Sequence, residues 1–559
     1  MLFNVLQLES TTCVLSSFSM SSLLVGIKKN FLIVLIVSQA PTLFKSIPNT
    51  LPLRPMLYQL SNAIIKTYLS LRFKRIERIR AQSPALQKNL LKTLIQQNKN
   101  TYWGKEHQLT QLSKADEIGD ALPISNYESI QPYINKMLHG EVNVLTPGTT
   151  EYFAKSAGTT SGKSKYLPIN RKMLHSNLIA SSWESMATVY DRRPTAQSFH
   201  HKNLILGGSL EPYTNYKQSI VGDVSAIMLH TMPGAGRPFY CPDFETALMP
   251  NWEEKIELIA QKASKANIVM IAGVPTWNLV LFHRVLEITG KANLLEIWPN
   301  LRTYMHGGVG FEPYREQFRT LLPTDDFDYM EIYNASEGYF SIQDTAEDGM
   351  LLLTDHGVYY EFVHISEIDH KSPIVLRLDQ VEKGEKYAML ISTFAGLWRY
   401  MIGDTVQFVS TSPYRIKVVG RTQHYINVFG EEVMVGNTDQ AIAETCLATK
   451  AVVKEYTVGP IYMTEPGKGG HQWLIEFDVE PKSISEFEAI LDHKLQDINS
   501  DYEAKRYKNM ALGQLKIDSL PNGSFHNWLK SKGRISAQVK VPRLSNTRKY
   551  INDLLSFIE

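Results

Sequence analysis

The sequence predicts an α/β fold with a large N-terminal domain and a smaller α+β C-terminal domain. From about residue 243, short apolar strands such as Ile268–Ala272 alternate with amphipathic helical patterns, which predicts mixed or parallel sheets flanked by helices. Residues 350–408 change to short alternating strands with charged turns, which is typical of an antiparallel or β-barrel-like part. After residue 420, capped helices around a strand indicate the smaller domain.

The length and composition set the domain count and exclude some classes of partner. A chain of 559 residues is too long for one compact core, so we expect a large domain at 56–419 and a small mobile domain at 420–559. The net charge of +2 gives no reason to expect a nucleic-acid partner. Cys13, Cys241 and Cys446 form neither a disulfide framework nor a metal-ligand spacing, which fits a reducing cytoplasm.

Residues 1–55 differ from the rest of the chain and have three interpretations. They are rich in Ser, Leu and Val, and the apolar run Phe31–Val37 is shorter than the roughly 20 residues that a bilayer-spanning helix takes. A lysine pair, then this apolar run, then Ser38–Ala40 together resemble a signal peptide, but the pattern begins too far from Met1. We expect a poorly ordered extension or an over-long start with Met56 as the true initiator. A membrane anchor is the third interpretation.

Several local patterns predict where elements begin. Ser83–Pro84 places a cap and a first-turn proline before an amphipathic helix, and Arg171–Tyr190 is helical in pattern. Leu204–Gly208 reads as a buried strand that ends in a turn. In the C-terminal part, we expect a capped helix after Asn437 and a second helix opened by a capping box at Ser483–Glu486.

A loop rich in hydroxyl and basic side chains lies between two short apolar runs in residues 152–169. Gly158 and Gly162 allow tight turns and close approach to a ligand, and successive amides there can form a concave anion site. The hydroxyl and ammonium groups suit a polyphosphate. The residues that we expect to contribute are Ser156, Thr159, Thr160, Ser161 and Lys163.

Two other interpretations of this loop are open. Ala157–Ser164 spells A-x-x-x-x-G-K-S, which is a Walker A sequence with Ala in the first position. A P-loop needs a helix directly after it, whereas Lys165–Ile169 alternates and contains a proline, which favours a second strand and a hairpin tip. A solvated turn without function is the third interpretation.

Three further positions could complete a nucleotide site. His306–Gly308 and Tyr333–Gly338 follow predicted strands, whose carboxyl ends are where ligands bind in such sheets. The Tyr333 ring could lie on a base, Glu337 could hold a hard cation such as Mg²⁺, and Asp404 could accept hydrogen bonds from ribose. Each has a structural alternative: a core tyrosine, a helix-capping glutamate and a turn aspartate.

The order of these motifs resembles the auxin-responsive Gretchen Hagen family of acyl acid amido synthetases, from about Tyr68 to the C-terminus. This family is a branch of the adenylate-forming superfamily, which includes acyl-CoA synthetases and firefly luciferase. Ala157, Trp398 and Met401 depart from residues that are common in the family. The resemblance rests on Ser156–Lys165, His306–Val309, Tyr333–Gly338, Leu397–Asp404, Gly420–Glu432 and Lys540–Arg543.

The resemblance implies the adenylate-forming fold and a ligase that uses ATP and Mg²⁺. A small carboxylic acid would attack the α-phosphate of ATP, and the amine of an amino acid would then take the acyl group and release AMP. Glu337 would hold Mg²⁺, and Lys540 would stabilise the phosphates, with Lys532 as the second candidate for that lysine. The implied nucleotide-binding residues are Ser156, Thr159, Thr160, Ser161, Lys163, Gly307, Gly308, Tyr333 on adenine, Ser336, Asp404 on ribose and Arg421.

The family pattern also implies a C-terminal domain that swings about Val418–Thr422 and a cytoplasmic monomer. The acyl pocket would be built from helices between Arg171 and Trp277, and Thr276 and Trp277 could line it or pack in the core. Two alternatives remain at this stage. The first is an acyl-CoA ligase that forms the same adenylate, and the second is a silent, membrane-associated relative.

Overall fold

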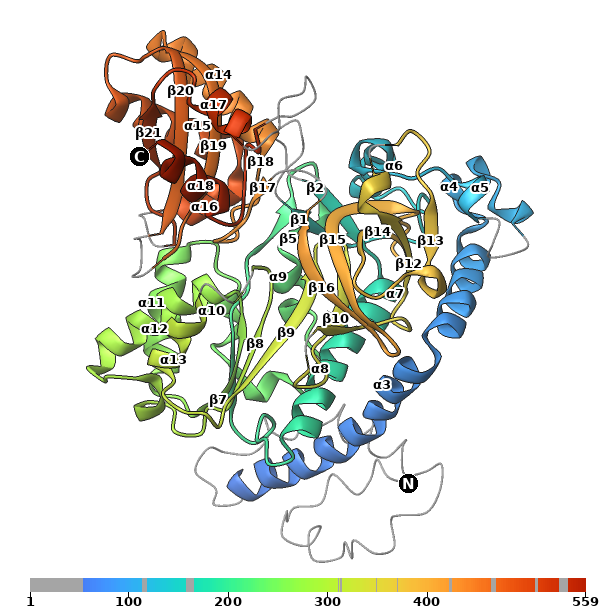
Figure 1. Cartoon of the computed structure of the whole chain (residues 1–559). Coiled ribbons are helices and arrows are strands. Elements are labelled where there is room, and N and C mark those ends of the chain that lie inside the picture. Colours follow the sequence, from blue (N-terminus) through green and yellow to red (C-terminus); the bar gives the residue numbers. More distant parts are fainter. Residues whose placement is uncertain are drawn as a thin grey trace, which may run out of the picture.

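The computed structural model describes residues 54–112, 118–156, 165–309, 311, 314–347, 349–368, 370–421, 425–463, 469–507, 511–531 and 541–558. The long helix α3 (Arg54–Asn98) runs along the outside of the large sheet and over α8 (Figure 1). The helix start predicted at Ser83–Pro84 corresponds to a kink, because Gln82 has non-helical angles (φ −134°, ψ 20°). The chain is also helical before this point, so the prediction located a break and not a first turn. The predicted extension lies almost entirely outside the described residues.

One large sheet of twelve strands among the described residues joins a parallel part to an antiparallel part. Its order is β13-β12-β14-β15-β16-β11-β10-β9-β8-β7-β3-β6. Strands β6, β3, β7, β8 and β9 are parallel, and the pairs from β9 onward to β13 are antiparallel, as the sequence predicted. The strands are β3 (Lys202–Ile205), β6 (Tyr240–Cys241), β7 (Ile268–Gly273), β8 (Thr303–His306), β9 (Asp328–Ala335), β10 (Gly338–Ile342), β11 (Met350–Leu352), β12 (Val358–His364), β13 (Val375–Arg377), β14 (Lys386–Thr393), β15 (Tyr400–Thr411) and β16 (Tyr414–Arg421).

A second sheet carries the hairpin that the sequence predicted. Strands β1 (Tyr152–Ser156) and β2 (Lys165–Ile169) pair antiparallel from Tyr152–Ile169 to Ser156–Lys165. The P-loop interpretation is therefore wrong, because a strand and not a helix follows the loop. The loop itself, residues 157–164, lies outside the described residues. Strands β5 (Tyr216–Gly222) and β4 (Leu210–Tyr213) complete this sheet.

Helices pack around the parallel part of the large sheet, as amphipathic patterns require. The helix predicted at Arg171–Tyr190 is confirmed, but a π-helical turn divides it into α7 (Arg171–Met173), η3 (Leu174–Ile179) and α8 (Ala180–Arg192). The other helices before residue 400 are α4 (Tyr102–Glu106), η1 (Leu109–Gln111), α5 (Ile118–Ala121), α6 (Tyr127–Leu138), α9 (Val224–His230), η4 (Arg237–Phe239), α10 (Phe244–Ala247), α11 (Trp252–Ala263), α12 (Pro275–Thr289), η5 (Leu294–Glu296), α13 (Arg315–Leu321), η7 (Ile365–Glu367) and η8 (Leu378–Gln380).

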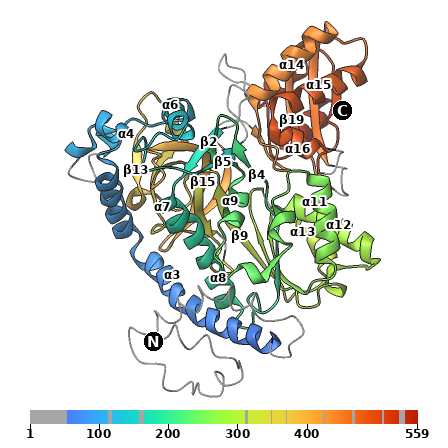
Figure 2. The ribbon, with the colours of Figure 1, turned by 180° about the vertical axis from the view of Figure 1, so that it is seen from behind.

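The C-terminal region, residues 425–558, forms its own three-stranded sheet with helices around it (Figure 2). Ser483 is the N-cap of α15, as predicted, and its hydroxyl accepts a hydrogen bond from the Glu486 amide. Helix α14 begins at Val435, so Asn437 lies within its first turn and accepts a hydrogen bond from the Met434 amide. The elements are β17 (Tyr425–Ile426), β18 (Val433–Met434), α14 (Val435–Thr449), β19 (Val452–Ile461), β20 (Gly470–Val479), α15 (Ile484–Ile498), α16 (Ser500–Arg506), β21 (Lys516–Leu520), α17 (Ser524–Ser531) and α18 (Lys549–Ile558).

The C-terminal region packs against α11, α12 and α13 in both views (Figures 1 and 2). The Tyr314 hydroxyl donates to the Val428 carbonyl at 2.8 Å, and Phe429 is fully buried in a hydrophobic cluster that contains residues of both parts. The chain segment that leads into the C-terminal region thus contacts the helices beside the large sheet. Among the described residues, no helix is both long and apolar enough to cross a membrane.

Candidate functional site

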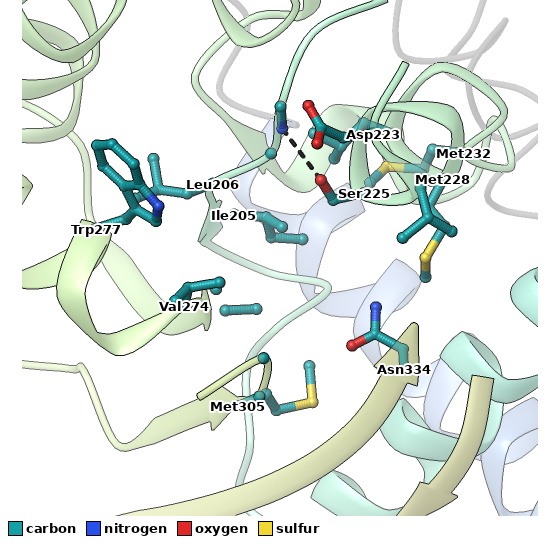
Figure 3. Close-up of a pocket in the computed structure, with 18 of the residues that line it drawn as sticks. Ile205, Leu206, Asp223, Ser225, Met228, Met232, Val274, Trp277, Met305 and Asn334 are labelled. Atoms are coloured by element: carbon teal, nitrogen blue, oxygen red, sulfur yellow. Dashed lines mark hydrogen bonds between the residues drawn. The ribbon is translucent and has the colours of Figure 1, made fainter. Parts of the chain in front are cut away.

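A cavity of approximately 860 Å³ lies between the large sheet and the C-terminal region. Its walls come from α8, α9, the ends of β3, β7 and β8, and α16. Figure 3 shows Trp277 and Leu206 on one side and Met228 and Met232 on the other. Six methionines line it: Met186, Met228, Met232, Met249, Met270 and Met305. The volume and the mainly apolar lining are typical of a small-molecule site.

The Gly207–Gly208 turn after β3 forms one edge of the cavity, and a buried lysine holds it. The Lys255 ammonium donates to the carbonyls of Gly207 at 2.6 Å and Gly208 at 2.8 Å. Burial lowers the pKa of Lys255 to about 8, against an opposing effect of Asp223. The Gly208 amide donates to Ser225 Oγ at 3.1 Å (Figure 3). The Ser209 amide donates to Asp223 Oδ2 at 3.1 Å. The backbone of this turn is therefore held by side chains from α11 and α9.

The predicted glycines Gly307 and Gly308 also line the cavity, directly after β8. A Cβ on Gly307 would lie 2.4 Å from the Ile332 carbonyl oxygen, so the neighbouring strand β9 requires glycine there. Gly308 has φ +84°, a left-handed conformation that favours glycine. The sequence analysis attributed these glycines to close approach of a nucleotide. The structure adds a local reason, which is the close packing of β8 against β9.

Tyr333 and Asp404 meet each other beside the cavity and are not among its lining residues. The Tyr333 hydroxyl donates to Asp404 Oδ2 at 2.5 Å, and both side chains are buried. The Tyr333 ring packs on Phe340 with 5.0 Å between ring centroids. Two residues that the motifs assigned to one nucleotide are thus brought together.

The other predicted site residues are spread around this pair. Ser336 and Glu337 form the half-buried turn between β9 and β10. Ser156 ends β1, with its hydroxyl 3.5 Å from Glu432 Oε2, and Arg421 ends β16 opposite Asp404 in register. The remaining predicted residues lie outside the described part of the chain: Thr159, Thr160, Ser161, Lys163, Lys532 and Lys540.

The C-terminal region contributes charged side chains to the cavity through α16. Asp501 and Lys505 line it, and the Lys505 ammonium lies 4.3 Å from the centre of the Trp277 ring. Burial, together with the nearby carboxylates of Glu432 and Asp223, raises the pKa of Asp501 to about 7 against the opposing effect of Lys505 and Lys155. Asp501 therefore changes charge close to neutral pH.

Family models match most of the chain in three consecutive blocks. The GH3 family N-terminal domain matches residues 72–247 and 210–327, the central domain 351–421 and the C-terminal domain 436–549. The chain belongs to the GH3 family. This is the Gretchen Hagen family that the motifs indicated, so that prediction is confirmed.

Curated relatives of this GH3 protein are named amido synthetases. An indole-3-acetic acid-amido synthetase of Arabidopsis thaliana is 23% identical and aligns over 88% of this chain and 93% of its own length. A jasmonoyl-L-amino acid synthetase of Nicotiana attenuata is 21% identical over 82% of this chain and 90% of its own.

Solved structures confirm the adenylate-forming fold of this GH3 protein. An acyl acid amido synthetase in complex with 2,4-DB has a TM-score of 0.58 at 15% identity and covers 88% of this chain and 97% of its own. A 2-hydroxyisobutyryl-CoA ligase in complex with 2-HIB-AMP and CoA has a TM-score of 0.54 at 12% identity, over 85% and 92% of the two chains.

The sequence range expected to build the acyl pocket can be compared with the lining of this cavity. The range from Arg171 to Trp277 does supply most of the lining, and Trp277 lines the cavity. Thr276 does not, since its side chain is fully buried and its hydroxyl lies 3.4 Å from the Phe429 carbonyl. Lys255, Asp223 and Asp501 were missed. The Gly207–Gly208 turn was the one feature of the sequence that could have indicated where these three side chains lie.

Proposed function

We propose that this GH3 protein is an ATP-dependent acyl acid amido synthetase. A carboxylic acid would form an acyl-adenylate and pyrophosphate, and the amine of an amino acid would then take the acyl group and release AMP. The observation that carries the proposal is one cavity in which an apolar interior meets glycine-lined strand ends, because the reaction needs an acyl tail and a phosphate-bearing group side by side.

The adenylation step joins two anions, so the protein has to offset charge repulsion and orient the reactants. We assign phosphate contacts to Ser156, Thr159, Thr160, Ser161, Lys163 and Lys540, and nucleotide contacts to Gly307, Gly308, Tyr333, Ser336, Asp404 and Arg421. Donors in the loop after β1 would face charge that develops on the phosphates. Buried Asp404, held by Tyr333, suits an acceptor for ribose hydroxyls.

The donor chemistry fits Mg²⁺ that arrives with ATP. Among the described residues, no group of three or more His, Cys, Asp or Glu side chains could hold a metal ion by itself. Mg²⁺ in nucleotide sites takes one or two carboxylates and completes its shell with phosphate oxygens and water. Glu337 would supply that carboxylate, and the ion would neutralise phosphate charge when bound.

The amide-forming step needs an unprotonated amine, and Asp501 is a suitable base. Its carboxylate lines the cavity on α16 and has a pKa of about 7, which is close to the pH at which a general base works best. Asp501 would accept a proton from the ammonium group before attack on the acyl carbonyl. Asp223 would add negative charge that attracts the ammonium.

The same proposal includes the division of the chain into two domains, the location of the protein in the cell and its partners. Residues 56–419 would form the large domain, and residues 420–559 would rotate about Val418–Thr422 between the two steps. The rotation would change the part of the site that the C-terminal domain forms, so that ATP could use the site in the first step and the amine in the second. We expect a cytoplasmic monomer whose partners are the carboxylic acid and the amino acid, without nucleic acid or membrane.

The test is acid-dependent exchange between ATP and pyrophosphate, followed by product analysis with amino acids and with coenzyme A. We expect Glu337→Gln to lower exchange at least a hundredfold, whereas Glu347→Gln, at an exposed carboxylate in the loop after β10, leaves it unchanged. Amide products would support the proposal. A thioester as the sole product would assign the protein to the CoA ligases, which share its fold.

A further inference from the structure

We propose that the acid substrate is a monocarboxylic acid with a long, unbranched hydrocarbon tail. This inference rests on the proposed function, because it concerns the acid that enters the same cavity. The tail would occupy the inner part of the cavity, which we define as the part formed by α8, α9, β3 and β7. The carboxylate would lie toward Gly207–Gly208, Gly307–Gly308 and α16.

The inner part of the cavity is lined by flexible apolar side chains. Met186 on α8, Met228 on α9 and Met270 on β7 all contribute to it. Methionine has three rotatable bonds and a polarisable sulfur, so it adapts to a chain that itself has many conformers. A lining of this kind favours a hydrocarbon chain over one rigid ring.

The aromatic residues around the inner part pack mainly on one another. Trp183 stacks on Phe199 with 5.9 Å between ring centroids, and Phe199 meets Phe239 edge-on at 5.5 Å. These rings form an apolar wall, and part of each ring face already has an aromatic neighbour. A flat aromatic ligand would have to compete with those contacts to stack there.

The polar side chains that line the inner part are mostly bonded within the protein. Ser182 Oγ donates to the Leu178 carbonyl at 2.8 Å, and Ser185 Oγ lies 2.8 Å from the Tyr339 hydroxyl. The Asn203 amide nitrogen donates to the carbonyls of Ser198 and Phe239. Asn203 Oδ1 is the exception, as a buried acceptor without a partner among the described residues. An indole N–H could meet this oxygen, so an indole acid is the alternative that the experiment has to separate.

The charges around the cavity exclude a second anionic group on the acid. Among the described lining residues, Lys255 and Lys505 are the cationic side chains. The Lys255 ammonium is bonded to two carbonyls, and Lys505 lies over the Trp277 ring on the α16 side. A carboxylate or phosphate on the tail would be buried without a counter-charge, which is strongly unfavourable.

The experiment compares straight-chain acids from butyrate to dodecanoate with indole-3-acetate, benzoate and a straight-chain dicarboxylate, in the ATP–pyrophosphate exchange assay on the full chain. We expect kcat/KM to rise about fourfold for each added methylene until the cavity is filled. The dicarboxylate is expected to be at least a hundredfold poorer than the monoacid of the same length. A preference for indole-3-acetate or benzoate over every straight-chain acid would overturn the proposal.

Ser182 offers a variant that shortens the inner part. Ser182→Phe fills space on α8 and loses only a bond within its own helix, so we expect the optimum to move to a shorter acid, with a larger loss of kcat/KM for decanoate than for butyrate. Ser182→Ala, the matched control, should keep the wild-type optimum. If Ser182→Phe does not fold, Ser182→Leu makes the same test with a smaller side chain. An unchanged optimum in the folded filling variant would overturn the placement of the tail.

A binding measurement separates this inference from the proposed function. Trp183 and Trp277 line the cavity, so their fluorescence can report the binding of decanoate and hexanoate without ATP. Tighter binding of decanoate than of hexanoate, without exchange by any acid, would refute adenylation and support the tail inference. If neither acid binds to a folded protein that still binds ATP, the tail inference fails.

Discussion

The Tyr333 hydroxyl lies 2.5 Å from Asp404 Oδ2, although β9 and β15 are separated in the sheet by β10, β11 and β16. Four strand spacings of about 4.8 Å would place the two strands roughly 19 Å apart in a flat sheet. The two side chains meet because the antiparallel part of the sheet curls, which accounts for its barrel-like shape (Figure 1). The bond links two residues to which we assign contacts with the nucleotide.

The first prediction concerns this bond. Tyr333→Phe keeps the ring and removes the donor, so the Asp404 carboxylate loses one of the contacts that orient it. A hydrogen bond to a charged group contributes roughly 1.5–3 kcal/mol, so we expect KM for ATP to rise about tenfold or more in the exchange assay. The control is Tyr360→Phe, which removes the hydroxyl of a buried tyrosine that lies near neutral carbonyl oxygens and not near a carboxylate. It should leave KM for ATP unchanged. Equal effects of the two substitutions would contradict a specific role for the bond.

The second prediction concerns Gly307. Gly307→Ala places a Cβ 2.4 Å from the Ile332 carbonyl oxygen, and main chain cannot move aside as a side chain can. We expect the free energy of unfolding to fall by about 2–3 kcal/mol, measured by urea denaturation. The control Gly420→Ala has open space around the new methyl group and should change stability by less than about 0.5 kcal/mol. If Gly307→Ala is as stable as the wild type, the close packing of β8 on β9 is not what requires glycine.

The third prediction concerns the stability of the protein as a function of pH. The folded pKa of Asp501 is raised to about 7, so at pH values between the ordinary aspartate pKa and 7 the folded state holds a proton that the unfolded chain releases. Stability is therefore lost as pH rises through this window. Asp501→Asn should raise the free energy of unfolding by about 1–2 kcal/mol at pH 8, with a smaller gain at pH 5.

A surface substitution and an activity profile complete the Asp501 test. Asp325→Asn, at an exposed position, should leave the melting temperature unchanged at both pH values. If Asp501 is the base, Asp501→Asn should also slow amide formation and remove its rise near pH 7, while exchange between ATP and pyrophosphate continues. A variant that forms amide at the wild-type rate would remove Asp501 from the mechanism but not from the stability argument.

The fourth prediction concerns the buried pair of Glu431 and His471. Glu431 accepts hydrogen bonds from His471 at 2.8 Å and from the amides of Val428 and Phe429 at 3.1 and 2.6 Å. Burial would raise the pKa of Glu431, but these donors outweigh burial and hold the pKa below its ordinary value. Its contribution is present above the unfolded glutamate pKa and is lost as pH falls through the lower folded value.

We therefore expect Glu431→Gln to lower the free energy of unfolding by about 3 kcal/mol at pH 7, measured by urea denaturation. His471→Asn should cost a similar amount. The double variant should cost less than the sum, because the two side chains interact directly. Additive losses would show that the pair is not coupled.

The sequence predicted the elements better than the site. Strand and helix patterns identified the hairpin at Tyr152–Ile169 and the α15 cap at Ser483, because the deciding signals are local. The helix at α14 was placed three residues late, since Asn437 is typical of a cap but here bonds back to Met434 from inside the first turn. Local preference cannot distinguish these two positions.

The site depends on contacts between distant residues, and this is why it was only partly predictable. Tyr333 and Asp404 could be assigned from motifs, but nothing in the sequence indicates that they bond to each other. Lys255 is an ordinary lysine in a helical pattern, and only the fold places it under the Gly207–Gly208 carbonyls. Asp501 gains its unusual pKa from burial and from Glu432 and Asp223, which come from other parts of the chain.

The cavity takes one wall from α16 and the opposite walls from α8 and α9, so its contents touch both parts of the molecule. A bound acid therefore contacts both α16 and the turn after β3, and it stabilises both segments against local opening. Amide protons in both segments should exchange with solvent more slowly in the presence of the acid.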